Sequence, residues 1–392
     1  MKVRTILVVC AAGLLAVQIF RNAAVEALAQ SQPARAATFW SDHPATELSL
    51  GMTRIAQASR SRRPIPASAF ALIGDAAAKE PLAPEPFLVR GIQAQLAGED
   101  TTAQRAFEAA QWRDPRSLPA AYFLADRYFH TGNKVGGLRE VGALARLSPS
   151  GNVTVAPYLA EYAADPSNWP ALRRLFQSNP GLADPTLIRL SDNIDTVPAV
   201  LALADPREKA ADAHWLPSLL NTLVNAGRYN QAQTIWARAS RIGDASGELV
   251  HDTAFRDKVS PPPFNWALTS STVGLAERQP GGRLHVIFYG QEDGILASQL
   301  LQLSPGTYRL SLQLLGDASR ARALAWSVWC DKADAPLSSA TLDAVAANGW
   351  TFQVPGGCSA QWLRLSGSSS DVSQQSDLSI AALKLQRIAP RA

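Results

Sequence analysis

The stretch His251–Trp266, "HDTAFRDKVSPPPFNW", separates two kinds of hydrophobic pattern. Before it, apolar residues recur with a helical period, and after it they recur at every second position, as in half-buried strands. Its three consecutive prolines, Pro261 to Pro263, stop a helix and favour a stiff extended connection. The sequence therefore predicts a multidomain chain, α then β, with a Pro-rich linker over 251–263.

Two helical units repeat with a period of 34 residues before this stretch. Pro81, Pro115 and Pro149 share the spacing, as do Gly98 and Gly132. Small residues let two helices approach closely, and each proline stops the second helix of a pair. The units read "PEPFLVRGIQAQLAGEDTTAQRAFEAAQWRDP" and "RSLPAAYFLADRYFHTGNKVGGLREVGALARLSP". They resemble the tetratricopeptide repeat family, which implies a helical solenoid that binds a protein partner.

The pattern loosens beyond Ser150 but returns in "WLPSLLNTLVNAGRYNQAQTIWARAS". There Gly227 precedes Ala232 by the interval seen in the first unit, so Trp236 is expected to pack where Phe107 does. One helix pair leaves its apolar face uncovered, so neighbouring pairs must stack. We therefore expect a tetratricopeptide-like helical solenoid over 25–250, with helices from Glu47 through Arg241.

Short strands separated by turn residues follow over 264–392. The expected strands are "NWALTS", "LHVIFYG", "YRLSLQLLG", "ALAWSVWC", "WTFQVP", "QWLRLSG" and "LSIAALKLQRI", and the Ser-rich "SGSSSDVSQQSD" is expected to be an exposed turn. Seven or eight such strands predict an antiparallel β-sandwich, similar to a jelly roll. Trp266, Trp326 and Trp350 are expected in its core.

The N-terminal residues resemble a membrane-targeting segment. Lys2 and Arg4 precede an apolar run over residues 5–20, so 1–24 is expected to be a signal anchor or a signal peptide in the inner membrane. The possible cleavage site Ala27-Leu28-Ala29 lies far beyond the run, which favours an uncleaved anchor. Cys10 is expected to be a buried apolar side chain, because the "LVVC" before it does not fit a lipidation site. Both alternatives place the bulk of the chain in a bacterial periplasm.

Cys330 and Cys358 lie 28 positions apart in the β-region. In an oxidising periplasm we expect a disulfide between them, which would stabilise the fold by about 3–4 kcal/mol. A metal-binding pair or a reactive thiol is the alternative, although no histidine or third cysteine lies beside them at ligand spacing.

The β-region resembles galactose-binding-like domains and carbohydrate-binding modules, most of all in the envelope-polysaccharide-associated tetratricopeptide proteins of sphingomonad-type bacteria. "PFNWALTSS", "GGRLHVIFYG", "LSPGTYRLSLQLLG", "WSVWC" and "FQVPGGCSAQWLRL" carry this resemblance over Pro261 to Ile388. It implies non-catalytic contact with a glycan or another envelope component.

Strand alternation selects the candidate glycan-binding residues. Sugar binding requires flat aromatic faces and forked polar groups. In "LAWSVWC", Trp329 lies on the side of the strand opposite the expected core face. In "QWLRLSG", Trp362 and Arg364 likewise lie on the side opposite Leu363 and Leu365. Tyr289 is a fourth candidate. The alternative is that these tryptophans fill the core or cover a sheet beneath a loop.

The sequence does not favour catalysis, metal binding or nucleic-acid binding. Glu292 and Asp293 are adjacent and so would point apart, which indicates a tight turn, with a Ca²⁺ site as the alternative. The five histidines, His43, His130, His214, His251 and His285, show no common metal-ligand spacing. With a net charge of +4 and scattered arginines, no electrostatic footprint for nucleic acid is present. We expect no enzyme activity, no cofactor and no bound metal.

These observations predict a periplasmic adaptor attached to the inner membrane. Its helical repeats would bind a protein of the polysaccharide or envelope machinery, and its sandwich a polysaccharide, in the assembly or export of exopolysaccharide. The alternatives are a structural envelope scaffold without a sugar site and a polysaccharide-processing enzyme.

Overall fold

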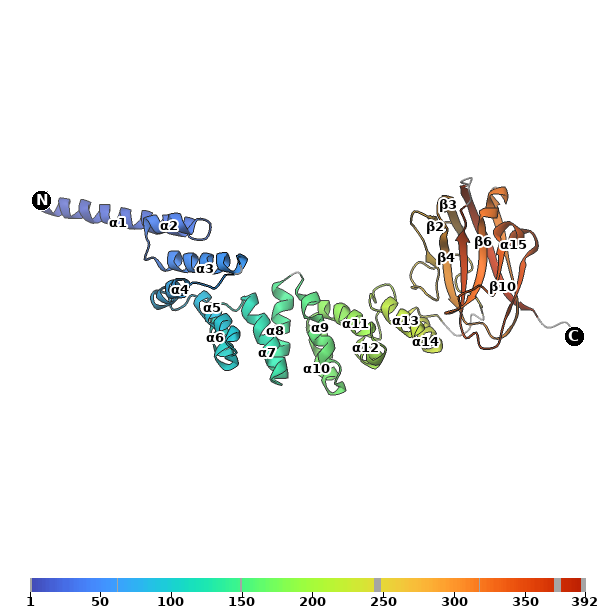
Figure 1. Cartoon of the computed structure of the whole chain (residues 1–392), viewed down its shortest axis with the longest axis horizontal. Helices are drawn as coiled ribbons and strands as arrows, with labels where there is room; N and C mark the ends of the chain where they lie inside the picture. Colours follow the sequence, from blue (N-terminus) through green and yellow to red (C-terminus); the bar gives the residue numbers. More distant parts are fainter. Residues whose placement is uncertain are drawn as a thin grey trace. The chain divides into compact units, whose positions relative to one another are not determined.

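A computed structural model describes residues 2–61, 63–148, 150–242, 248–316, 318–369 and 375–388. Pro149 and the centre of the Ser-rich turn, residues 370–374, lie outside the described residues. The chain forms two compact units, Met1–Val155 and Ala156–Ala392. The first is helical, and the second contains helices followed by two β-sheets (Figure 1). The expected order of α then β is therefore confirmed.

The helices of the first unit form antiparallel pairs. Neighbouring helices α3 and α4, α5 and α6, and α7 and α8 make the most extensive contacts in this unit. The bounds are α1 Lys2–Leu28, α2 Pro33–Phe39, α3 Pro44–Arg60, α4 Ala67–Lys79, α5 Glu85–Leu96, α6 Asp100–Arg113, α7 Leu118–His130, α8 Lys134–Leu147 and α9 Gly151–Tyr162, which crosses into the second unit.

Glycines end the first helix of equivalent pairs. Gly98, Gly132 and Gly227 have φ angles of 75°, 78° and 74°, a left-handed conformation that disfavours other residues. After α5, the N–H of Glu99 donates to the Ala94 carbonyl at 2.8 Å, and after the later helix α13, the N–H of Arg228 donates to the Leu223 carbonyl at the same distance. These are Schellman caps. The interval from Gly227 to Ala232 therefore marks the same helix–turn–helix geometry as in the first repeat.

Small and large residues meet between paired helices, as the sequence predicts. A Cβ added at Gly91 of α5 would lie 2.7 Å from the Phe107 ring of α6, so the site requires glycine. Phe107 also stacks on Phe123 of α7, with ring centroids 4.0 Å apart. This stacking continues the core from one pair into the next.

Helix α1 is long and apolar enough to cross a membrane. Its segment Ile6–Leu28 has 23 residues and a mean hydropathy of 1.9. Cys10, expected to be buried, is exposed on this helix, because no protein segment packs against this part of α1.

The second unit begins with shorter helices. Proline or short 3₁₀ turns precede several of them, so the regular period of 34 is lost. The bounds are η1 Pro166–Asn168, α10 Trp169–Ser178, η2 Pro180–Leu182, α11 Ala183–Ser191, η3 Ile194–Thr196, α12 Val197–Leu203, α13 Leu216–Asn225 and α14 Tyr229–Ala239.

Two antiparallel five-stranded sheets follow, with the orders β1-β4-β9-β6-β7 and β2-β3-β10-β5-β8. The placing of β3 beside β10, and of β4 beside β9 in the other sheet, is the wound order of a jelly roll. The bounds are β1 Ala267–Leu268, β2 Gly274–Gln279, β3 Arg283–Phe288, β4 Gly294–Leu301, β5 Gly306–Gly316, η5 Ala318–Ala323, β6 Leu324–Cys330, β7 Ser338–Thr341, α15 Leu342–Asn348, β8 Trp350–Val354, β9 Gln361–Gly367 and β10 Ser376–Ile388.

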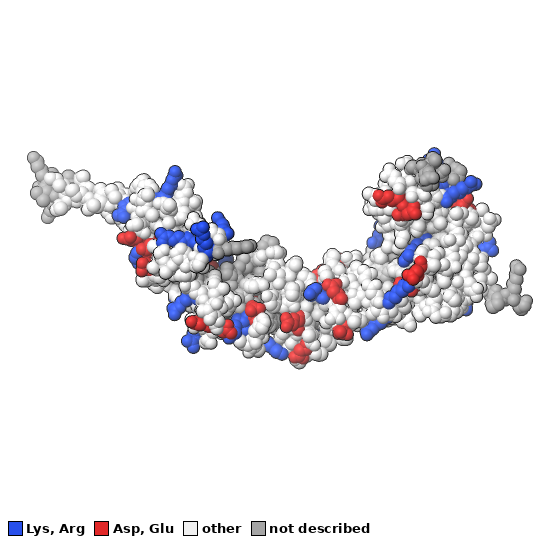
Figure 2. Space-filling model, viewed as in Figure 1, with Lys and Arg blue, Asp and Glu red and all other residues white. Residues whose placement is uncertain are grey.

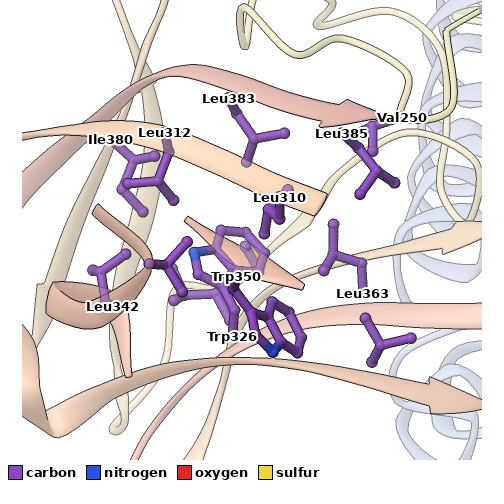
Figure 3. Packing of buried hydrophobic residues seen from close by; sticks show 14 of the residues in the cluster. Val250, Leu310, Leu312, Trp326, Leu342, Trp350, Leu363, Ile380, Leu383 and Leu385 are labelled. Carbon is purple, nitrogen blue, oxygen red and sulfur yellow. The ribbon is translucent and has the colours of Figure 1, made fainter. Parts of the chain in front are cut away.

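The sandwich core lies between the two sheets. Trp326 and Trp350 are buried among leucines from both sheets and from α15 (Figure 3). Trp266 is also buried, and its ring centroid lies 5.9 Å from that of Trp326. The expectation that these tryptophans belong to the core is confirmed.

The segment around the triple proline packs closely on its neighbours. Phe255 enters the sandwich core. The carbonyl of Pro261 accepts from the Trp236 indole N–H at 2.8 Å, and that of Pro263 accepts from the Leu300 N–H, also at 2.8 Å. The change of period thus lies inside one compact unit.

Candidate functional site

Helices α5, α7 and α9 line a hollow of about 510 Å³ in the first unit. Helices α5 and α7 are the first helices of neighbouring pairs, and α9 follows the second of these pairs. The apolar side chains at its surface are Ile92, Leu118 and Tyr122, which are 46%, 39% and 43% exposed. Phe107 and Phe123 form its floor. Exposed apolar residues gathered in one hollow are typical of an interaction surface.

Polar groups complete the lining of this hollow. Gln95, Asp126 and Thr154 come from α5, α7 and α9 respectively. Their side chains can form hydrogen bonds with a ligand whose apolar groups enter the hollow. The set suits an extended or helical peptide, which carries both kinds of group. We call this hollow the helical groove.

Hydrogen bonds on the paired helices hold the groove in shape. The Tyr128 hydroxyl of α7 donates to Glu108 of α6 at 2.9 Å. Burial, together with this carboxylate, raises the pKa of Tyr128 to about 12. Buried Glu140 of α8 accepts from Arg139 and from Gln111 of α6. These bonds link α6, α7 and α8 into one body.

Three of the four predicted glycan-binding residues lie together on the outer face of the sandwich. Trp329 of β6 pairs with Trp362 of β9 in register, and Ser327 pairs with Arg364. The Arg364 guanidinium carbon lies 5.2 Å from the Trp329 ring centroid and 5.7 Å from that of Trp362. All three side chains are half-buried. We call Trp329, Trp362 and Arg364 the aromatic face.

Tyr289 lies away from these three residues. It follows β3, which belongs to the other sheet. Alternation within one strand predicts which side of that strand a residue occupies. It does not predict which strands share a sheet, so Tyr289 could not be placed from the sequence.

The two indole N–H groups of the aromatic face already have protein partners. The Trp329 indole N–H donates to the Ser327 hydroxyl, and the Trp362 N–H donates to Asp331, both at 2.9 Å. Burial lowers the pKa of Arg364, and Asp331 opposes this shift. A sugar at this face would therefore stack on the rings rather than bond to the indole N–H groups.

The loop between α13 and α14 contacts Asp331 and Lys332, beside the aromatic face. The Tyr229 hydroxyl donates to Asp331 at 2.6 Å, and the Lys332 ammonium donates to the Asn225 carbonyl at 2.7 Å. Burial and the Asp331 carboxylate raise the pKa of Tyr229 to about 12. A joint between helices and sandwich thus lies beside the aromatic face, and sequence reasoning missed it because it involves residues far apart in the chain.

The predicted disulfide is confirmed. The sulfurs of Cys330 and Cys358 are 2.06 Å apart, and the bond ties the end of β6 to the loop before β9. Asp331 directly follows Cys330, so the disulfide also supports the joint. Such a bond is typical of proteins in oxidising compartments.

Glu292 and Asp293 contact different partners. Glu292 accepts from the Thr272 hydroxyl at 3.0 Å, whereas Asp293 accepts from the N–H and hydroxyl of Ser369 at 2.7 Å each. Hydrogen bonds from Ser369 lower the pKa of Asp293. Among the described residues, no group of three or more His, Cys, Asp or Glu side chains could hold a metal ion.

No family model matches this chain. No curated protein sequence matches it either. The candidate sites therefore depend on the geometry of this chain alone.

Two further hollows lie in the second unit. One of about 910 Å³ lies beside α10, α12 and α14, with apolar Leu201, Trp215 and Ile235 in its lining. Its charged lining residues have both signs: Arg173, Arg238, Asp205 and Glu208. The other, of about 510 Å³, lies between α14 and β4. No pattern in the sequence indicates either of them, because each is formed by elements that are not consecutive.

Proposed function

We propose that this protein is a non-enzymatic adaptor of the bacterial envelope that binds a segment of a partner protein in the helical groove. Ile92, Leu118 and Tyr122, exposed in one hollow lined by α5, α7 and α9, are the observation that supports it. A partner segment that covers these side chains would remove apolar surface from water. This burial would stabilise the complex by roughly 25 cal/mol per Å² of apolar surface.

The charge distribution favours a ligand recognised by shape and apolar contact. Figure 2 shows basic and acidic side chains interspersed on the visible face, without a long stripe of one sign. An electrostatically recognised polymer would require such a stripe. We therefore infer that the occupant is a peptide segment whose apolar side chains contact Ile92, Leu118 and Tyr122.

Co-purification with matched variants tests this proposal. Leu118→Asp places a charge in the groove, whereas Val135→Asp places one on α8, where Val135 is 82% exposed and outside the groove. The full chain, extracted from native membranes, should lose its partner in the first variant and keep it in the second. Equal recovery of the same proteins from both variants would contradict the proposal.

We further propose an envelope location at the inner membrane, with the bulk in the periplasm, and a role in exopolysaccharide assembly. The disulfide and the apolar helix α1 support the location. The role rests on the resemblance to tetratricopeptide proteins with a galactose-binding-like or carbohydrate-binding-module-like domain.

Glycan binding at the aromatic face is a second proposal. The outward position of Trp329 and Trp362 supports it, because two neighbouring indoles provide a stacking surface. Titration calorimetry of the full chain with envelope polysaccharides would show heat that Trp329→Ala removes. Absence of heat favours a scaffold without a sugar site. Release of reducing ends would instead indicate an enzyme.

A further inference from the structure

Helix α1 consists of two parts with different surroundings. The apolar side chains of its first part are exposed, among them Leu7, Leu14 and Phe20. The helix continues without a break to Leu28, and one side of its second part, around Val25, packs against α2. Figure 1 shows the first part extending beyond α2, and the second part running beside it.

The end of α1 contributes to the folded core. Val25 and Ala29 are buried together with Ala36 of α2, and Trp40 packs against this cluster. The Ala29 N–H donates to the Val25 carbonyl at 2.8 Å, so the backbone here is helical. These side chains can be buried together only if the end of α1 remains part of the chain that contains α2.

Side chains at the junction of the two parts also contact the following segment. The Arg21 guanidinium donates to the Phe39 carbonyl at 3.1 Å and lies 4.6 Å from the Trp40 ring centroid. The Phe20 and Phe39 rings meet edge to face at 6.0 Å. We call Phe20, Arg21, Phe39 and Trp40 the juxtamembrane collar.

From these contacts we propose that α1 is retained after export and that the juxtamembrane collar lies at the lipid headgroup level of a phospholipid bilayer. Cleavage after Ala29 would remove Val25 and Arg21, which pack against Ala36 and Trp40. The motif Ala27-Leu28-Ala29 lies at the end of the packed helix, not in an extended segment open to a peptidase.

The length of α1 supports the position of the collar. Residues 6–20 span roughly 22 Å at about 1.5 Å per residue, less than a hydrocarbon core of about 30 Å. Phe39 and Trp40 extend the lipid-facing surface beside Phe20. Aromatic rings and arginine are the residues that favour the membrane interface.

Intact mass measurement tests retention. The full chain, expressed with a C-terminal tag and extracted from membranes, should have a mass that includes residues 2–29. Ala27→Arg, which destroys the small-residue motif on an exposed position, should leave the processing unchanged. A mature chain that begins at Gln30, or a variant that is processed differently from the wild type, would overturn the proposal.

Limited proteolysis tests whether the end of α1 belongs to the folded unit. Val25→Asn buries a polar group, and cleavage by trypsin at Arg35 should accelerate by about ten-fold or more. Ala23→Asn makes the matched change on an exposed position of the same helix and should have no effect. Equal rates for Val25→Asn and the wild type would contradict the packing argument.

Fluorescence quenching tests the position of the collar. In vesicles of phosphatidylcholine and phosphatidylglycerol brominated near the headgroup, Trp40→Phe should remove a quenched component of the full chain. Trp112→Phe, which replaces an exposed indole of the same unit, should not. Undiminished quenching in Trp40→Phe would place the collar outside the interface.

This inference rests on the membrane location in the proposed function, but not on the helical groove. Loss of partner binding in Leu118→Asp would leave the mass and the quenching unchanged. The two proposals therefore fail in different experiments.

Discussion

The hydroxyl of Tyr229, at the start of α14, donates to the Asp331 carboxylate after β6 at 2.6 Å, across 102 residues of sequence. Asp331 also accepts from the Trp362 indole. One carboxylate thus joins the last helix pair to the outer face of the sandwich. The disulfide at the preceding residue limits the freedom of this carboxylate.

Tyr229→Phe should lower the free energy of unfolding of the second unit by about 1 kcal/mol, because a hydrogen bond to a charged acceptor is lost at a partly solvated site. Asp331→Asn should have a similar effect. Denaturant titration measures both, and Asp334→Asn, a change at an exposed neighbour, is the control. If all three variants unfold like the wild type, the joint contributes nothing to stability.

His285 should make stability depend on pH. Burial lowers the pKa of His285, but hydrogen bonds to Asp377 at 2.8 Å and to Glu277 at 3.2 Å outweigh it, so the net shift is upward. Because both ring nitrogens face carboxylates, the charged ring, which donates from both, is favoured. This stabilisation is fully present below the unfolded-state pKa of about 6.5 and is lost as the pH rises through the higher folded-state pKa.

The partners of His285 are largely exposed, so we expect an effect of less than about 1 kcal/mol. Denaturant titrations of the wild type and of His285→Gln between about pH 5 and 8 measure the contribution of His285 to the free energy of unfolding. The difference in unfolding free energy should shrink as the pH rises. A difference that stays constant would show that the pKa of His285 does not change on folding, which would contradict the expected upward shift.

Removing the disulfide should destabilise the sandwich. Cys330→Ser frees a loop of 28 residues, which should cost about 3–4 kcal/mol through the entropy of the unfolded chain. Thermal unfolding with and without reductant measures this loss. Cys10→Ser, a change on α1 outside the sandwich, should leave the transition in place.

Gly91 and Gly74 should respond in opposite ways to the same substitution. Gly91→Ala places a methyl group against Phe107 and should destabilise the first unit by about 1–3 kcal/mol. Gly74, in α4, has no atom within 4 Å of an added Cβ, so Gly74→Ala should stabilise by about 0.5–1 kcal/mol. Two destabilised variants would mean that the packing around α4 is tighter than described.

Local patterns in the sequence predicted much of the fold. Alternation in "LAWSVWC" placed Trp326 in the core and Trp329 outside, because strand β6 has one buried and one partly covered face. The glycine spacing predicted the equivalent turns at Gly98 and Gly227, because only a left-handed residue closes them readily.

The remaining elements and contacts of the fold could not be predicted from local patterns in the sequence. Strand β4 was missed because the consecutive residues Leu300 and Leu301 are both buried, so no alternation is visible. Strands β2 and β7 were missed because they are short and mostly polar, and helix α15 because it has only seven residues. The joint between Tyr229 and Asp331 has no local signal.

Site-specific photocrosslinking tests the adaptor proposal most directly. A benzophenone amino acid at position 118, in the groove, is compared with one at position 135 on α8, in the full chain within native membranes. We expect position 118 to form a covalent adduct with one partner protein, and position 135 to form none. Absence of an adduct at 118, or the same adducts from both positions, would contradict a protein-binding groove.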